Sequence, residues 1–169
     1  MDTQQARDNF LKLILENKRI IIKICNSYCA NKNYREDLAQ EITFHLWKSG
    51  DHFNAGQKFS TWMYRVALNV AISFYRKEKT AIPSRSFADG FADIEDKSDG
   101  ADAVEENITL LQLFINELNE LDKALMILFL EEKSYAEIAD ILGISETNVA
   151  TKISRIKKRI KQNFSALNK

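Results

Sequence analysis

Polar and basic side chains of the kinds that bind DNA bases and phosphates are concentrated in one short stretch of the chain. They are Thr147, Asn148, Thr151, Lys152, Arg155 and Lys158. Lysine and arginine neutralise phosphates, and a helix carrying polar side chains can read base-pair edges in the major groove. From Thr151 to Lys169 there are seven Lys or Arg residues and no Asp or Glu. This pattern predicts contact with duplex DNA, the alternative being a solvated basic face on an ordinary helical hairpin.

The residues around this set predict two helices joined by a glycine turn. Ser134 and Glu137 have the spacing of a capping box that starts the first helix. Gly143 is expected to end it, because glycine adopts the left-handed conformation without steric cost, and Ser145 is expected to cap the second helix. One face of the second helix is apolar and carries Val149, Ile153, Ile156 and Ile160. This arrangement is typical of a helix-turn-helix.

The rest of the composition predicts an almost entirely helical protein of the cytoplasm. Five glycines and one proline are few among 169 residues, and apolar residues recur every three or four positions. No stretch reaches the ~18 apolar residues that a membrane span needs. The first eight residues are polar and lack the apolar core of a signal peptide. We therefore expect no membrane insertion.

The net charge of zero conceals an uneven distribution along the chain. Residues 1–85 carry a charge of +6, residues 86–132 of −11 and residues 133–169 of +5. Two basic ends around an acidic middle predict two nucleic-acid-facing domains and a segment that avoids DNA. Residues 81–106 hold the only proline, two glycines and eight acidic residues against two basic ones. This composition predicts a flexible, acidic linker.

The fold class predicted from these features is all-α, with two small helical domains joined by a flexible acidic linker and a helix-turn-helix in the C-terminal domain. The predicted domains are residues 1–82 and 107–169, with the linker at 83–106. Apolar periodicity indicates a first helix over residues 10–29, broken near Asn17, and a loop at residues 31–33.

Periodic apolar residues continue on both sides of the linker. In the N-terminal domain, Leu38, Ile42 and Leu46 are expected to form an inner stripe together with Trp47. In the C-terminal domain a helix is expected to resume at Asn107, and another is expected to span residues 122–130. With the helix-turn-helix these make a four-helix domain.

A strongly periodic helix is predicted to begin at Phe59. Its apolar stripe contains Phe59, Trp62, Met63, Val66, Ala67 and Val70. Tyr64 and Arg65 are expected on other faces. Aromatic and basic residues alternate along this segment, a pattern that suits single-stranded nucleic acid, because bases stack on rings and cations follow phosphates. Core packing is the alternative, and the helical spacing favours it for Trp62.

Cysteine and histidine indicate neither a metal site nor catalysis. Cys25 and Cys29 are one helical turn apart in an apolar run, which favours buried thiols over a disulfide. With only His45 and His52 in addition, a four-ligand zinc site is not expected. The sequence also has no phosphate loop and no nucleophile with an evident base, so we expect neither a cofactor nor enzymatic activity.

Both halves together resemble the bacterial extracytoplasmic-function sigma factors, two-domain proteins that direct RNA polymerase to promoters. The segments EDLAQEITFHLWKS and HFNAGQKFSTWMYRVALNVAISFYRK are similar to region two of that family. The segment INELNELDKALMILFLEEKSYAEIADILGISETNVATKISRIKKRIK is similar to region four. The resemblance covers residues 10–80 and 108–162, in the family's order.

The resemblance implies partners and roles for individual residues. Core RNA polymerase, through its β′ and β subunits, and promoter DNA would be the partners, with an anti-sigma factor as regulator. The residues implied to dock on the β′ coiled coil are Asp37, Gln40 and Glu41. Those implied to melt and read the minus-ten element are Phe53, Asn54, Lys58, Phe59, Arg65, Asn69, Arg76 and Lys77. Thr147, Asn148, Thr151, Lys152, Arg155 and Lys158 would read the minus-thirty-five element.

The chain departs from the family pattern at several of these places. Leu68 stands where many members have Arg, and Ser73 where Asp is common. In the recognition helix, Thr147 and Ala150 stand where Gly and Lys are frequent in the family. These departures affect which promoter sequence is expected to be recognised more than they affect the expected class of protein. The competing hypothesis is a transcriptional regulator that binds paired half-sites of duplex DNA as a dimer, without polymerase.

Overall fold

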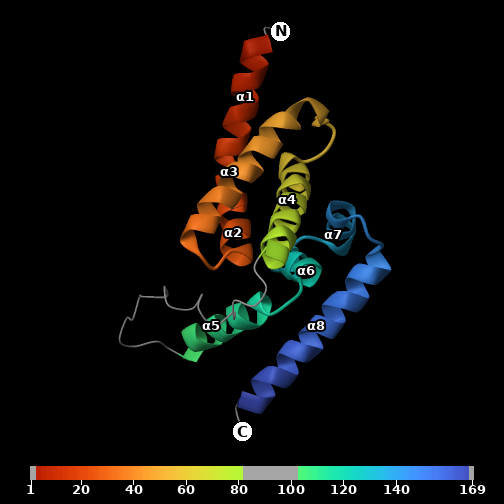
Figure 1. Ribbon diagram of the computed structural model, residues 1–169. Helices are drawn as coiled ribbons and strands as arrows, with labels where there is room; N and C mark the ends of the chain where they lie inside the picture. The colour runs from red at the N-terminus through yellow and green to blue at the C-terminus, as the bar shows by residue number, and fades with distance from the viewer. Residues whose placement is uncertain (1–2, 82–102, 168–169) are drawn as a thin grey trace. The chain divides into compact units, whose positions relative to one another are not determined.

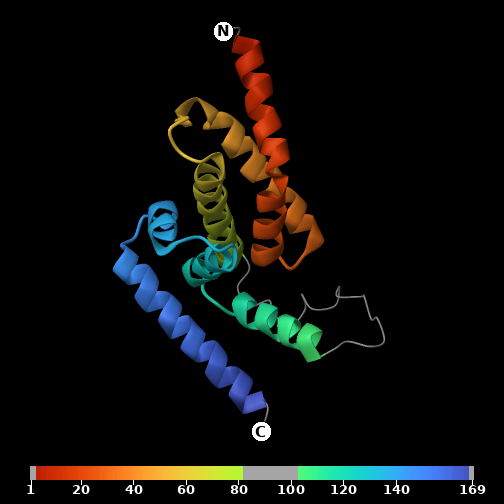
Figure 2. The same ribbon diagram turned by 180° about the vertical axis from the view of Figure 1, so that it is seen from behind.

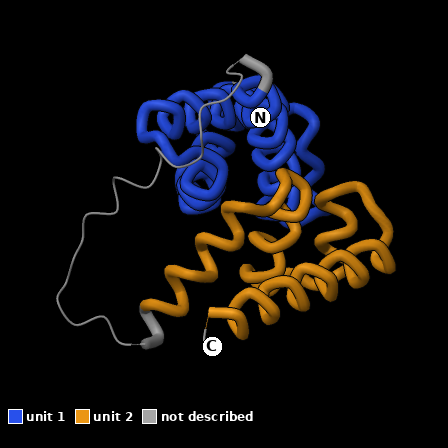
Figure 3. The backbone as a smooth tube through the Cα atoms, turned by 60° about the horizontal axis from the view of Figure 1, so that its bottom comes forward, with its two compact units in different colours: residues 1–85 blue, residues 86–169 orange. Residues whose placement is uncertain are grey.

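The computed structural model describes residues 3–81 and 103–167, and within them every regular element is a helix (Figure 1; Figure 2 gives the view from behind). The chain divides into two compact units, residues 1–85 and 86–169 (Figure 3). The predicted all-α class is thereby confirmed. The linker predicted at residues 83–106 lies outside the described residues except for its last part.

The first unit is built on three mutually packed helices, α2, α3 and α4. Its elements are α1 (Thr3–Glu16), α2 (Lys18–Tyr28), α3 (Lys32–Lys48), the 3-10 helix η1 (Gly50–His52) and α4 (Phe59–Ala81). The core between them is apolar, because Ile24, Leu38, Ile42, Leu46 and Met63 have no exposed surface. The inner stripe predicted for α3 is therefore confirmed at its three aliphatic positions.

Local polar contacts decide where the helices of this unit begin and end. The predicted break near Asn17 is confirmed, and the amide Nδ2 of Asn17 donates to the carbonyl of Leu13 at 2.9 Å. The predicted loop at residues 31–33 is wrong, since α3 begins at Lys32. The reason is a side-chain cap, in which Oδ1 of Asn31 accepts the backbone N–H of Asn33 at 2.9 Å.

Two aromatic residues lie on faces other than those predicted. Trp47, predicted on the inner stripe of α3, is 45% exposed. Tyr64, predicted on an outer face of α4, is 2% exposed. Helix α4 packs against both α2 and α3, so it buries more than one stripe. Trp62 is 5% exposed, which confirms its core position.

The second unit contains α5 (Ala103–Asn116), α6 (Glu120–Leu130), α7 (Tyr135–Leu142) and α8 (Glu146–Leu167). Helix α8 packs on α6 and α7. A core of Ile115, Leu118, Met126 and Ile156 joins α5, α6 and α8. Helix α5 begins four residues before the predicted Asn107, because the alanine and glutamates assigned to the linker are good helix formers. Helix α6 begins at Glu120, before the predicted 122, since Asn119 caps it.

The predicted helix-turn-helix is confirmed at each of its local signals. Oγ of Ser134 accepts the N–H of Glu137 at 3.2 Å, while Oε2 of Glu137 accepts the N–H of Ser134 at 2.9 Å. Gly143 has a φ of 68°, in the left-handed region, and ends α7. Oγ of Ser145 accepts the N–H of Asn148 at 3.1 Å and so caps α8.

Candidate nucleic-acid interface

Helix α8 has one buried side and one polar side. Val149 and Ile153 have no exposed surface, and Ile156 is 3% exposed, as the predicted stripe requires. Five of the six residues predicted to bind duplex DNA are exposed, namely Thr147, Asn148, Thr151, Arg155 and Lys158. The capped turn and the buried stripe therefore hold a ready-formed polar helix face outward from the second unit.

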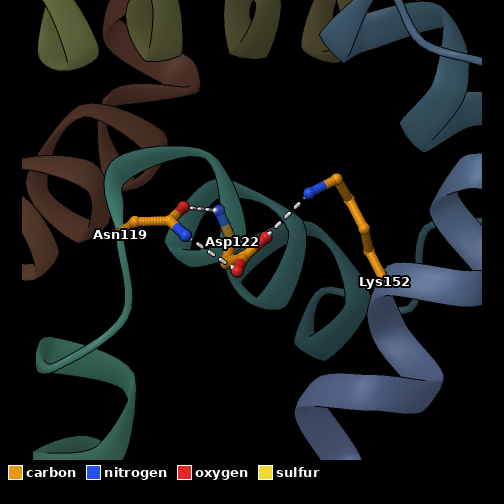
Figure 4. Close-up of polar contacts among 3 residues, drawn as sticks. All are labelled: Asn119, Asp122 and Lys152. Carbon is orange, nitrogen blue, oxygen red and sulfur yellow. Dashed lines mark hydrogen bonds and ion pairs between the residues drawn. The ribbon is translucent and has the colours of Figure 1, made fainter.

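Lys152, the sixth residue of that set, points elsewhere. Its Nζ contacts Oδ1 of Asp122 on α6 (Figure 4), at a distance of 3.4 Å. The Lys152 side chain is 31% exposed and that of Asp122 is 14% exposed. In this structure Lys152 thus joins two helices of the unit. The sequence alone did not predict Asp122 as the partner of Lys152, because thirty positions separate the two residues. The one local signal was the position of Asp122 in the first turn of a helix.

Lys157 is a second cation of α8 that contacts α6. Its Nζ lies 4.1 Å from the ring centroid of Phe129, within the range of a cation–π interaction. Lys152 and Lys157 leave the helix on opposite flanks of the apolar stripe, given about 100° per residue. Two basic residues of α8 therefore contact α6, although Lys157 is itself exposed, as are Arg155 and Lys158.

In the first unit, two predicted base-contact residues belong to a cluster of four rings, Phe10, Phe53, Phe59 and Trp62. Their ring centroids are 5.3 to 6.4 Å apart. Phe53 and Phe59 are half-buried in it. The part played by Phe10 was not predicted, since its ring comes from α1. Gly50 makes room for it, because a Cβ there would lie 2.7 Å from the ring.

The other residues predicted for the minus-ten element are spread along the loop before α4 and along α4 itself. Asn54, Lys58, Asn69, Arg76 and Lys77 are exposed, whereas Arg65 is half-buried. Oδ1 of Asn54 accepts the N–H of Gly56 at 2.9 Å and shapes the loop. Seventeen helical positions separate Phe59 from Arg76, a distance of about 25 Å. The structure therefore arranges these residues as an extended track.

The outer face of α3 combines the three residues predicted to dock on polymerase with apolar surface. Asp37, Gln40 and Glu41 are exposed. Next to them an open groove of about 510 Å³ is lined by Leu11, Ile14, Ala39, Gln40, Thr43, Phe44 and Trp47. Phe44 is 59% exposed and Trp47 is 45% exposed. Sequence reasoning missed this apolar part because it assigned Trp47 to the core.

The titratable groups of the first unit include two with shifted pKa values. Burial raises the pKa of Cys25 to about 11, and both Cys25 and Cys29 are buried free thiols, as predicted. The pKa of Glu78 is raised by burial and, to a smaller extent, by the charge of Asp37. Among the described residues no three His, Cys, Asp or Glu side chains are grouped so as to hold a metal ion. None of the described helices is long and apolar enough to span a membrane.

Comparison with protein families gives one match in each unit. The model of sigma-70 region 2 matches residues 13–81, and that of sigma-70 region 4 matches residues 108–160. The chain is 26% identical to the ECF RNA polymerase sigma factor SigW of Bacillus subtilis, over 95% of this chain and 91% of SigW. It is 28% identical to SigX of the same organism, over 81% of this chain and 74% of SigX.

Solved structures with the same fold cover nearly the whole chain. The sigma factor RpoE, in complex with the anti-sigma factor NepR from Bartonella quintana, superposes with a TM-score of 0.71 at 20% identity. The match covers 93% of this chain and 97% of RpoE. CnrH, in complex with the cytosolic domain of CnrY, superposes with a TM-score of 0.66 at 17% identity, covering 96% and 94%. At these identities the likeness establishes the fold.

Proposed function

This chain belongs to the extracytoplasmic-function sigma factors, and we propose on that premise that it binds core RNA polymerase and directs promoter-specific transcription initiation. The observation that carries the proposal is that matches to regions 2 and 4 fall, in that order, on two separate compact units. We assign residues 1–82 to the region 2 domain, 83–106 to the linker and 107–169 to the region 4 domain. No catalytic reaction is part of this role.

In the region 4 domain, α8 is proposed to read the minus-thirty-five element as duplex. A helix of 22 residues is about 33 Å long, and its N-terminal half fits the major groove. The exposed residues Thr147, Asn148 and Thr151 are near that end, followed by Arg155 and Lys158. Supporting this role, the polar face of α8 is exposed while the opposite face is buried in its own unit.

In the region 2 domain, the loop before α4 and the exposed side of α4 are proposed to hold the melted minus-ten strand. Extruding a base costs a few kcal/mol, which stacking and phosphate contacts can offset. Phe53 and Phe59 would supply ring surface. Asn54, Lys58, Arg65, Asn69, Arg76 and Lys77 would supply polar and basic contacts along the strand.

The outer face of α3 is proposed to bind the β′ subunit. Asp37, Gln40 and Glu41 would make its polar contacts, while the exposed rings of Phe44 and Trp47 would be buried against polymerase. Exposed apolar surface rimmed by polar residues is typical of protein interfaces. We also propose that an anti-sigma factor regulates this chain, since RpoE, one of the structural relatives, is in complex with an anti-sigma factor. The site of action would then be the cytoplasm, where RNA polymerase works.

Reconstitution with core RNA polymerase tests the proposal. The purified chain should bind core enzyme, and the pair should initiate at a defined set of sequences selected from a random promoter library. Glu41→Ala should lower affinity for core enzyme. Arg155→Ala should leave that affinity unchanged and reduce promoter use, by about 1–3 kcal/mol if Arg155 contacts a base bidentately. Failure to bind core enzyme, combined with binding of paired half-sites in duplex DNA, would identify a transcriptional regulator instead.

A further inference from the structure

Lys152 is set apart from the other polar residues of α8 by its position at the edge of the apolar stripe. It directly precedes Ile153, which has no exposed surface. Successive residues of a helix are about 100° apart around the axis, so Lys152 flanks the stripe and Thr151 lies about 100° further round. The side chain of Lys152 therefore runs along the contact between α8 and α6, where it is 31% exposed.

The carboxylate that receives Lys152 is itself held in place. Oδ1 of Asp122 lies 3.4 Å from Nζ of Lys152, while Oδ2 accepts Nδ2 of Asn119 at 2.9 Å (Figure 4). The backbone N–H of Asp122 donates to Oδ1 of Asn119 at 2.9 Å. Asp122 is 14% exposed and lies in the first turn of α6, where the helix dipole favours a negative charge. The Asp122 carboxylate is thus held in position by contacts that do not involve Lys152.

We propose that Asp122 is a positioning residue for promoter reading, which through its ion pair with Lys152 orients α8 on α6 and keeps that ammonium away from the DNA. The inference rests on the proposed function of α8. Apolar packing of Ile153 and its neighbours has little directional preference, whereas the ion pair ties Lys152 to one carboxylate at a fixed position on α6. The pair therefore adds a rotational constraint that the apolar stripe alone lacks. Lys152 is an anchor, and Arg155 contacts DNA.

The salt dependence of DNA binding tests the different roles of Lys152 and Arg155. The slope is the magnitude of the fall in log affinity with log salt concentration, and removing one cation that neutralises a phosphate lowers it by about 0.9. The full chain is titrated with a random-sequence DNA duplex over a range of salt concentrations. Arg155→Met is the matched control and should lower the slope by about 0.9. Lys152→Met should leave the slope unchanged, since its charge is already paired.

The partner variant tests the restraint directly. Asp122→Asn should release the ammonium to nearby phosphates, which raises both affinity for the random duplex and the slope, by up to about 0.9. The double variant Asp122→Asn, Lys152→Met should return the slope to that of the wild type. A fall of the slope in Lys152→Met as large as in Arg155→Met would overturn the proposal, as would an unchanged slope in Asp122→Asn.

The same series separates this proposal from a failure of the proposed function. If the wild type does not bind DNA and Arg155→Met changes nothing, α8 is not a reading helix and both proposals fail. If Arg155→Met behaves as expected and Lys152→Met behaves like it, only the role of Asp122 fails. A merely structural ion pair would lower the melting temperature of Asp122→Asn without changing the slope, and this result would also overturn the proposal.

Rescue by a conservative variant supplies an independent readout. Selectivity is measured as the ratio of affinities for a duplex selected with the polymerase complex and for the random duplex. It should fall several-fold in Asp122→Asn and Lys152→Met, and it should stay near the wild-type value in Lys152→Arg, whose guanidinium can pair with the same carboxylate. An equal decrease in Lys152→Arg and Lys152→Met would contradict an anchoring role.

Discussion

The proposed duplex-reading face of α8 and the proposed strand-holding loop before α4 present their residues in opposite ways. Arg155 is exposed on a helix whose other side is buried. Phe53 and Phe59 instead lie half-buried against Phe10 and Trp62. The polar face of α8 is complete once the helix has formed and packed on α6 and α7. The loop surface depends on rings contributed by three separate segments, so it is a product of tertiary packing.

This difference bears on how each surface would meet DNA. A rigid polar helix binds a duplex without rearranging its own contacts. A ring of the cluster that stacks on a base must give up part of its packing on the other rings. An aromatic pair contributes about 0.5–1.5 kcal/mol beyond its buried area, and stacking on a base about 1–3 kcal/mol. The two interactions are of similar size, which makes an exchange between them energetically feasible.

Removing Trp62, the most buried member of the ring cluster, should affect stability more than any other change considered below. Trp62→Ala should lower the free energy of unfolding of the first unit by about 3–5 kcal/mol, because Trp62 is 5% exposed and contacts all three other rings. Trp47→Ala is the matched control at 45% exposure and should cost less than about 1 kcal/mol. Denaturant titration followed by the remaining tryptophan measures both. Equal decreases would show that the ring cluster stabilises this unit no more than an exposed ring does.

Gly50 in the first unit and Gly143 in the second are required for different reasons. Gly50→Ala should cost about 1–3 kcal/mol by crowding Phe10, and Phe10→Leu should relieve it. Gly143→Ala should cost about 1–2 kcal/mol through its φ of 68° alone, since a Cβ there meets nothing within 4 Å. Thermal melting of each variant tests this. Gly143→Asn should cost less than Gly143→Ala, and the reverse order would contradict a backbone origin.

A smaller effect is expected from the cap that starts the helix-turn-helix. Ser134→Ala removes one half of the capping box and should destabilise α7 by about 0.5–2 kcal/mol. Ser154→Ala, at an exposed position within α8, should change stability by less than about 0.5 kcal/mol. Hydrogen exchange of the α7 amides measures the difference. Equal exchange rates in the two variants would indicate that packing alone holds α7.

The smallest effect concerns the carboxylates near the proposed polymerase-binding face. The raised pKa of Glu78 means that its ionised form disfavours the folded state. Glu78→Gln should therefore stabilise the first unit above that pKa, and the gain should vanish at lower pH, where Glu78 is protonated in both folded and unfolded chains. Melting temperatures measured as a function of pH follow the change. In an Asp37→Asn background the gain should be smaller, because one of its two causes is removed.

How much of this molecule could be predicted depended on the range of the interactions involved. The capping box, the glycine turn and the buried stripe of α8 involve residues a few positions apart, and all were predicted. The short cap at Asn31 is equally local and was overlooked, as was the early start of α5. The site was predicted as residue types in sequence order, with their roles taken from a family resemblance that the region 2 and region 4 matches support.

Local sequence patterns were enough to specify the helices, the turn between α7 and α8, and the division into a basic, an acidic and a basic segment. Helix packing, in contrast, determines that Trp62 is buried while Trp47 is exposed, that Phe10 completes the ring cluster, and that Lys152 pairs with Asp122. The difference arises because helix formation depends on neighbours within one or two turns. The partner of a side chain across a helix contact depends on how whole helices pack, and spacing along one helix does not specify that packing.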